Sequence, residues 1–137
     1  MSLEDNKRLV ARFLDEVYNR GNLAVAEELV AEDYVSHNQM EIEVLGPEAI
    51  KEAARAQRAA FPDQETFVDA MIAEGDLVVV RGRDRGTHSG AAFGGIAASG
   101  RAFEITWIDV FRVQDGKLRE AWLEINLASF RKQLTGE

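Results

Sequence analysis

The spacing of apolar residues changes once along this chain, and that change limits which folds the chain can adopt. Over most of residues 4–61 the apolar side chains have helical spacing, beginning with a stripe formed by Leu9, Phe13 and Val17. From Glu65 onward, apolar side chains alternate with polar ones, which is the spacing of β-strands. Helices followed by strands, rather than alternating with them, predict an α+β domain with its helices on one face of a curved antiparallel sheet.

Local capping signals divide the helical part into three segments. Gly21 suits a left-handed C-terminal cap for the first helix, and Asn22 suits the N-cap of a short second helix. Pro47 fits the first turn of a third helix, which ends at Phe61. Residues 33–38 have no helical stripe and lead from the second helix to the third.

The alternating part predicts strands separated by turn signals. Tight turns are expected at 74–76 and 114–116, where glycine lies beside acidic residues. The strands are expected from residue 65 to the first turn and over 77–85, 102–113 and 117–127. A glycine-rich connection, expected to be flexible, covers residues 86–100. Its glycines match neither GxGxxG nor GxxxxGK[ST], so no nucleotide site is predicted.

The composition removes several classes of function. The chain has no cysteine, so it can form no disulfide and has no thiolate for metal binding or nucleophilic attack. Its 24 acidic and 16 basic residues give a formal net charge of −8, which argues against a nucleic-acid partner. Apolar runs such as residues 77–80 are far shorter than the roughly 20 residues of a membrane span, so no membrane partner is expected. With no signal-peptide pattern at its start, the chain is expected to be one cytoplasmic domain over residues 1–137.

The two histidines are the side chains best suited to proton transfer near neutral pH. His37 lies in the segment that leads to the third helix, and His88 lies in the glycine-rich connection. For either residue the alternative is a loop histidine that is exposed or hydrogen-bonded. The two are far apart in the sequence and form no HxH or HExxH pattern, so no metal site is predicted.

The last predicted strand carries one polar side. Trp122, Glu124 and Asn126 alternate with Leu123 and Ile125, so they share one side of the strand. This side either lines a partly polar pocket or forms a solvated outer face, and the alternation alone favours neither.

The preceding strand carries an acid between two aromatic residues. Trp107, Asp109 and Phe111 alternate along it, so Asp109 is either a carboxyl in a cavity or an inward charge neutralised by an arginine. Buried charges are usually paired, which favours the second interpretation. The available arginines are Arg81, Arg83 and Arg112.

A series of short motifs covers nearly the whole chain. They are Asp33-Tyr34-Val35-x-His37, Gly46-Pro47-Glu48, Phe61-Pro62-Asp63, Glu74-Gly75-Asp76, Gly86-Thr87-His88-x-Gly90, Ser99-Gly100-Arg101, Asp109-Val110-Phe111-Arg112, Asp115-Gly116-Lys117, Trp122 and Gln133-Leu134. In this order and spacing the series resembles the SnoaL-like polyketide cyclase (ester cyclase) family of the nuclear-transport-factor-2-like (NTF2-like) superfamily. The resemblance implies a cone-shaped α+β barrel, in which a curved antiparallel sheet wraps around three N-terminal helices and encloses an apolar pocket. It also implies a homodimer whose pocket holds a small apolar molecule.

The resemblance further implies an intramolecular aldol condensation that needs no metal or organic cofactor. The family's general acid/base is an aspartate four residues after the tryptophan that matches Trp122, and here that position is Asn126. A carboxamide does not transfer protons near pH 7, although it can hydrogen-bond a carbonyl. We therefore expect His37 and His88 to supply the acid/base chemistry, with Glu124 as a third candidate and Asn126 orienting the substrate.

The expected function is acid/base chemistry on a small apolar carbonyl compound. In this interpretation the substrate-binding wall is formed by Tyr34, Trp107, Asp109 and Trp122. Two alternatives stay open, because one fold hosts many functions. The pocket could hold a hydrophobic ligand without catalysis, or the chain could be an interaction module with an exposed apolar sheet face.

Overall fold

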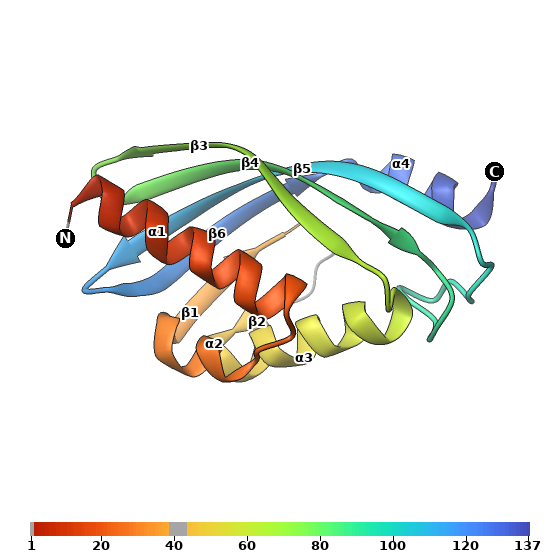
Figure 1. The fold of residues 1–137 in the computed structure, drawn as a ribbon, viewed down its shortest axis with the longest axis horizontal. Coiled ribbons are helices and arrows are strands. Elements are labelled where there is room, and N and C mark those ends of the chain that lie inside the picture. The colour runs from red at the N-terminus through yellow and green to blue at the C-terminus, as the bar shows by residue number, and fades with distance from the viewer. Residues whose placement is uncertain (1, 39–43) are drawn as a thin grey trace.

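The computed structural model describes residues 2–38 and 44–137, and its main feature is a curved sheet of six strands (Figure 1). In chain order the elements are α1 (Leu3–Phe13), a π-helical segment (Leu14–Asn19), α2 (Ala24–Leu29), β1 (Val30–His37), β2 (Val44–Leu45), α3 (Gly46–Ala60), β3 (Glu65–Glu74), β4 (Leu77–Thr87), β5 (Ala102–Gln114), β6 (Lys117–Ile125) and α4 (Leu127–Thr135). Helices α1, α2 and α3 lie on one side of the sheet, whereas α4 lies at the end that holds the C-terminus. The α+β class and the helices-first order are confirmed. None of the described helices is long and apolar enough to cross a membrane.

The strands lie in the order β2-β1-β6-β5-β4-β3. Strands β3 to β6 form the predicted antiparallel meander. The expectation of a wholly antiparallel sheet is wrong at β1, which covers most of residues 33–38 and runs parallel to β6. After β1 the chain adds the short strand β2, passes through α3 and returns to the sheet at the opposite edge as β3. Strand β1 therefore meets β6 only through a long-range pairing. No local turn signal can predict such a pair.

Several backbone signals act as the sequence predicts, and one does not. Gly21 has a φ of 67°, the left-handed conformation expected at the end of the first helical stretch. Asp115 and Gly116 have φ values of 53° and 71°, which suit the tight turn that joins β5 to β6. Leu23 rather than Asn22 is the N-cap of α2, and it makes no side-chain capping bond.

The first helix is held at its start and altered at its end. Ser2 and Asp5 form a capping box, in which each side chain accepts a hydrogen bond from the other residue's backbone N–H. At Phe13 the helix continues into the π-helical segment. This segment carries Tyr18, whose ring packs edge-on against Phe13 with a centroid distance of 5.7 Å.

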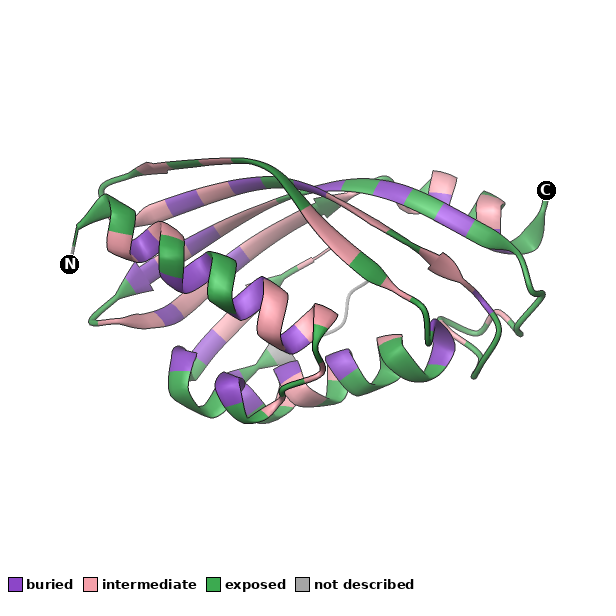
Figure 2. Ribbon diagram, in the orientation of Figure 1, coloured by how far each residue is buried: buried purple, intermediate pink, exposed green. Residues whose placement is uncertain are grey.

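A buried apolar core fills the space between the helices and the sheet, as the purple bands in Figure 2 show. One cluster joins α1, α2 and α3 to the inner faces of β4, β5 and β6. A second, largely aromatic cluster lies nearer the C-terminal end and consists of Ala60, Phe61, Phe103, Ile105, Phe130 and Leu134. Helix α4, which the sequence patterns did not predict, supplies the last two of these.

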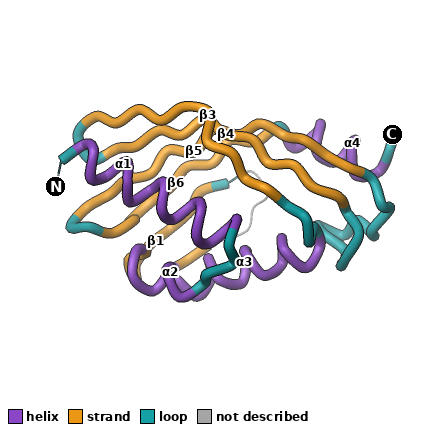
Figure 3. The backbone as a smooth tube through the Cα atoms, in the orientation of Figure 1, coloured by secondary structure: helices purple, strands orange, loops and turns teal. Residues whose placement is uncertain are grey.

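The glycine-rich connection docks on the end of α3 (Figure 3). The Gly90 N–H donates to the Ala60 carbonyl at 3.0 Å, and the Ala91 N–H donates to the Ala59 carbonyl at 2.9 Å. A Cβ at Gly90 would lie 1.9 Å from the Ala59 oxygen, so only glycine permits this approach. The docked connection brings the ring of Phe93 against the aromatic cluster.

Candidate functional site

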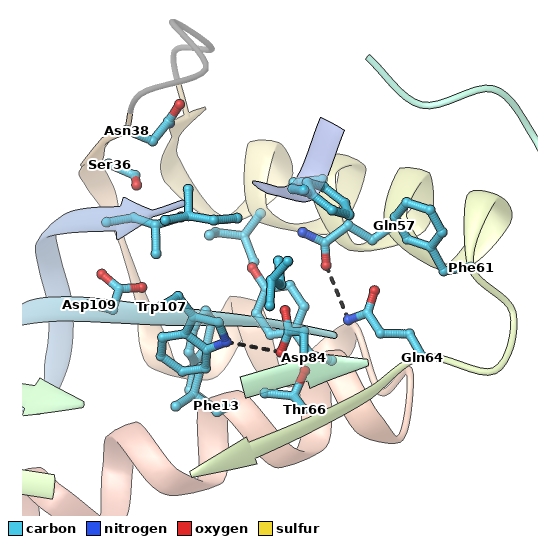
Figure 4. Close-up of a pocket in the computed structure, with 18 of the residues that line it drawn as sticks. Phe13, Ser36, Asn38, Gln57, Phe61, Gln64, Thr66, Asp84, Trp107 and Asp109 are labelled. Atoms are coloured by element: carbon cyan, nitrogen blue, oxygen red, sulfur yellow. Dashed lines mark hydrogen bonds between the residues drawn. The ribbon is translucent and has the colours of Figure 1, made fainter. Parts of the chain in front are cut away.

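A cavity of about 150 Å³ lies between the helices and the inner face of the sheet (Figure 4). The aromatic side chains that line it are Phe13, Tyr18, Tyr34, Phe61, Phe93, Phe103, Trp107, Phe111 and Phe130. Its polar lining consists of Ser36, Asn38, Gln57, Gln64, Thr66, Asp84 and Asp109. A mainly apolar cavity with a few polar groups is the usual form of a small-molecule site.

Asp109 lines this cavity from β5 as an unpaired acid. Its Oδ1 atom is buried and has no hydrogen-bond partner among the described residues. Burial raises the pKa of Asp109 well above its usual value, because the apolar surroundings disfavour the charged carboxylate. The expected pairing with an arginine is therefore wrong. Arg83 binds Asp69 at 2.9 Å and Arg112 binds Asp76 at 2.8 Å, because strand alternation directs both arginines to the outer face.

Asp84 is a second, half-buried acid of the cavity, contributed by β4. The Trp107 Nε1–H donates to Asp84 Oδ1 at 3.1 Å, and the Thr66 side chain also hydrogen-bonds this carboxyl. Burial raises the pKa of Asp84, while the two hydrogen bonds stabilise the carboxylate and oppose that rise. Sequence reasoning missed this residue. Its alternation with Val80 and Gly82 is the signal that could have placed it on the inner face.

Gly82 makes room for the Trp107 indole. The two residues are direct partners in the β4–β5 ladder. A Cβ on Gly82 would lie 2.3 Å from Trp107 Cζ2 and 2.7 Å from the Phe67 carbonyl oxygen. Glycine therefore lets the indole lie across β4 with its N–H directed at Asp84.

Two tyrosine hydroxyls add polar groups to the cavity. Tyr18 comes from the π-helical segment, and Tyr34 comes from β1 and hydrogen-bonds Ser36. Burial raises the pKa of both phenols, so both hydroxyls keep their protons near neutral pH and can donate. Tyr34, Trp107 and Asp109 are thus the predicted binding residues that the structure brings together at the cavity.

His37 and Trp122 lie on the outer face of the sheet. The two are direct partners in the parallel β1–β6 ladder, and their rings stack at a centroid distance of 5.6 Å. His37 Nε2 lies 2.8 Å from Glu120 Oε2, and the Arg112 guanidinium lies over the Trp122 ring. Contrary to expectation, neither His37 nor Trp122 lines the cavity, because the strand pairing directs both away from it.

His88 is fully buried but is not part of the cavity lining. Its Nε2–H donates to the Ala91 carbonyl at 2.8 Å, since a carbonyl oxygen only accepts. Its ring packs edge-on against Phe61, and its Nδ1 atom has no partner among the described residues. His88 therefore anchors the glycine-rich connection rather than facing a ligand, which differs from its expected place.

Glu124 and Asn126 are exposed and also lie outside the cavity lining, contrary to expectation. Asn126 is the N-cap of α4, and its Oδ1 atom accepts a hydrogen bond from the Ser129 N–H at 3.0 Å. The apolar side of β6 faces inward instead, with Leu123 and Ile125 in the cavity wall. The polar side of the last strand is thus the outer face.

The chain matches the family model described as SnoaL-like polyketide cyclase over residues 8–134. The protein therefore belongs to the SnoaL-like polyketide cyclase family, as its motifs indicate. No curated protein matches the chain.

Solved structures share the whole fold. A candidate SnoaL-like polyketide cyclase from Jannaschia sp. CCS1 matches with a TM-score of 0.88 at 24% identity, covering 98% of this chain and 94% of that one. IdmH from Streptomyces antibioticus, a candidate polyketide cyclase, matches with a TM-score of 0.79 at 31% identity, covering 95% and 98%. An NTF2-like protein of unknown function from Burkholderia pseudomallei K96243 matches with a TM-score of 0.79 at 18% identity, covering 98% and 99%. The NTF2-like fold is thereby confirmed.

We expect Gly82→Ala to displace the Trp107 indole and to break its hydrogen bond to Asp84. The added methyl group overlaps the indole, so the free energy of unfolding should fall by about 1–3 kcal/mol. Urea unfolding followed by fluorescence, in a Trp122→Phe background, reports both the stability and the surroundings of Trp107. An unchanged midpoint together with an unchanged emission spectrum would contradict this role for Gly82.

We expect Asp109→Asn to stabilise the protein at pH 7. In the wild type the folded state holds the Asp109 proton more tightly than the unfolded chain, whose pKa is about 3.9. Stability therefore falls as pH rises above that value, by about 1.4 kcal/mol per pH unit until the folded pKa is reached. Urea unfolding at pH 4 and pH 7 should show a gain for the variant that is large at pH 7 and small at pH 4. Equal differences at both pH values would mean that the pKa of Asp109 is not raised.

Proposed function

We propose that the protein is an enzyme that closes a ring in a small apolar dicarbonyl compound by aldol-type acid–base chemistry, without a cofactor. The observation that carries this proposal is the Asp109 carboxyl, whose buried Oδ1 atom has no partner among the described residues and which lines a mainly apolar cavity. A buried polar atom without a protein partner is suited to bind a ligand oxygen. Membership of the SnoaL-like polyketide cyclase family supports the same class of reaction.

The two acids of the cavity suit opposite roles. Asp109 accepts no hydrogen bond from the described residues that would stabilise its charge, so burial favours its protonated form, which can donate to a carbonyl oxygen. Asp84 receives hydrogen bonds from Trp107 and Thr66, which favour its carboxylate and make it the better proton acceptor. Two carboxyls whose surroundings differ in this way form a natural acid and base.

Asp84 and Asp109 line the same cavity from neighbouring strands. Asp84 pairs with Ile105 across the β4–β5 ladder, and Asp109 lies four residues further along β5. Four residues of strand span about 13 Å, and the Trp107 indole lies between the acids in Figure 4. In an aldol ring closure the carbon that loses a proton bonds to the carbonyl carbon whose oxygen gains one. The proposed reaction therefore requires the two carboxyl side chains to converge on one centre from these two backbone positions.

In the proposed reaction the Asp84 carboxylate removes a proton from the carbon beside one carbonyl group, which forms an enolate. The enolate carbon bonds to the second carbonyl carbon and closes the ring. Asp109 gives its proton to the oxygen of that second carbonyl, which becomes a hydroxyl. Asp84 is then protonated and Asp109 is ionised, so one proton must return from Asp84 to Asp109 through solvent. The two carboxyls transfer only protons, and the reaction consumes no oxidant or reductant.

The cavity volume suits a substrate of about one ring. A cavity of about 150 Å³ lined by apolar side chains is enough to hold benzene. The hydroxyls of Tyr18 and Tyr34 offer further donors to the carbonyl oxygens. The substrate class that fits is therefore a short dicarbonyl chain that closes to a six-membered ring.

We expect the wild type to convert 2,6-heptanedione to 3-hydroxy-3-methylcyclohexanone faster than buffer does. Loss of its hydroxyl together with a proton from the carbon beside the carbonyl then releases water and gives 3-methylcyclohex-2-enone, whose ultraviolet absorbance is measured. Asp109→Asn and Asp84→Asn should each lower kcat by roughly 100- to 10,000-fold, the usual effect of removing a general acid or base. His37→Ala is the matched control. It should retain the wild-type rate, because His37 lies on the outer face.

Three outcomes would contradict these assignments. Unchanged rates in both aspartate variants would remove Asp84 and Asp109 from the chemistry. A lost rate in His37→Ala would return the acid–base role to that histidine. No acceleration by the wild type would overturn the enzyme proposal itself.

The alternative is a protein that holds a hydrophobic ligand in the same cavity without catalysis. It is favoured by Asn126, because the position of the family's aspartate here carries a carboxamide that caps a helix. This alternative predicts that the diketone shifts NMR signals of cavity residues, such as the Trp107 indole N–H, while no enone forms. It also predicts equal affinity in the wild type and Asp84→Asn.

A further inference from the structure

The end of the cavity beyond Asp84 carries two glutamine side chains that the proposed reaction does not use. Gln57 projects from α3, and Gln64 lies in the turn before β3. Both are half-buried and line the cavity. The Gln64 Nε2–H donates to Gln57 Oε1 at 3.4 Å, as the dashed line in Figure 4 shows. The two amides form one polar patch in a largely aromatic wall.

The hydrogen bond between the two amides leaves N–H donors on one glutamine and a carbonyl acceptor on the other, and both can bind a ligand. In the observed bond, Gln57 Nε2 keeps its N–H groups and Gln64 Oε1 keeps its lone pairs, and neither atom bonds another described residue. Interchanging the nitrogen and oxygen of both amides reverses the bond. One glutamine still keeps N–H donors and the other keeps a carbonyl. A ligand group that both accepts and donates is matched in either orientation.

The surroundings of the glutamine pair favour an uncharged ligand group. The described residues that line the cavity include no lysine, arginine or histidine, so an anion there would have no counter-charge. A ligand cation could meet Asp84 but could not accept the hydrogen bonds that the glutamine N–H groups offer. A neutral hydroxyl needs no counter-charge and can accept these hydrogen bonds.

We propose that Gln57 and Gln64 bind a hydroxyl group at the far end of the ligand whose carbonyl oxygen faces Asp109. The hydroxyl oxygen accepts from the Gln57 N–H, and the hydroxyl proton is donated to the Gln64 carbonyl. The ligand is then an apolar, ring-sized carbonyl compound with a hydroxyl opposite its carbonyl. This subsite rests on the proposed use of the cavity for carbonyl compounds, and it does not depend on turnover there.

Calorimetric titration with two ring-sized ketones tests the subsite. The wild type should bind 4-hydroxyacetophenone about 3- to 10-fold more tightly than 4-methoxyacetophenone, because a methoxy oxygen accepts but cannot donate to Gln64. In Gln64→Leu and in Gln57→Leu this ratio should fall to within about 2-fold. Gln114→Leu is the matched control and should keep the wild-type ratio, since Gln114 lies at the end of β5, outside the cavity lining, and hydrogen-bonds Asp76 in the β3–β4 turn.

The outcomes separate the subsite from the proposed reaction. A wild-type ratio near one, or a ratio that survives in both cavity variants, would overturn the glutamine subsite. If neither ketone binds the wild type, the use of the cavity for carbonyl compounds is wrong as well. If the ratio changes as expected but 2,6-heptanedione is not cyclised, the subsite stands and the proposed reaction is wrong.

Discussion

The pairing of β4 with β5 is the constraint on which the cavity depends. The ladder runs without a bulge from the Leu77–Arg112 pair to the Thr87–Ala102 pair, so the alternation along β5 is preserved over its length. Trp107 and Asp109 therefore share the inner face with Phe103 and Phe111. A slip of one residue would turn all of them outward. Gly82 adds a steric check on this register, because a Cβ in its place would overlap the indole of its partner.

Burial without a counter-charge then determines what the inner acids can do. Asp69 on the outer face is paired with Arg83, which holds the pKa of that carboxyl below its usual value. Asp109 has no such partner in the part of the chain that the structure describes, and its pKa moves in the opposite direction. The chain has the cations to neutralise an inner acid, but strand alternation places them on the other side of the sheet. The pKa of Asp84 is raised by burial, but hydrogen bonds from neutral donors oppose that rise.

Local patterns in the sequence predicted the helices-first order, the β3–β6 meander and its turns, because each depends on residues close together in the chain. The parallel β1–β6 pair and helix α4 were missed, since both depend on packing against distant segments. In the site, alternation found Trp107 and Asp109 but not the direction in which His37 points. Which side of a strand faces inward is decided by its neighbours, and the neighbour of His37 is Trp122 on a distant strand. The scarcity of histidine therefore had no bearing on where the cavity lies.

Asn126 affects the cavity by capping helix α4, not by facing the ligand. Asparagine and aspartate are about equally good N-caps, so capping α4 does not by itself require the loss of an acid. An aspartate would even interact favourably with the helix dipole. The exposed Asn126 amide is committed to the Ser129 N–H, and the helix that it caps carries Phe130 into the cavity wall. With Asp84 and Asp109 already on the inner face, an acid at position 126 is dispensable in the proposed reaction, whereas the cap still holds Phe130 in place.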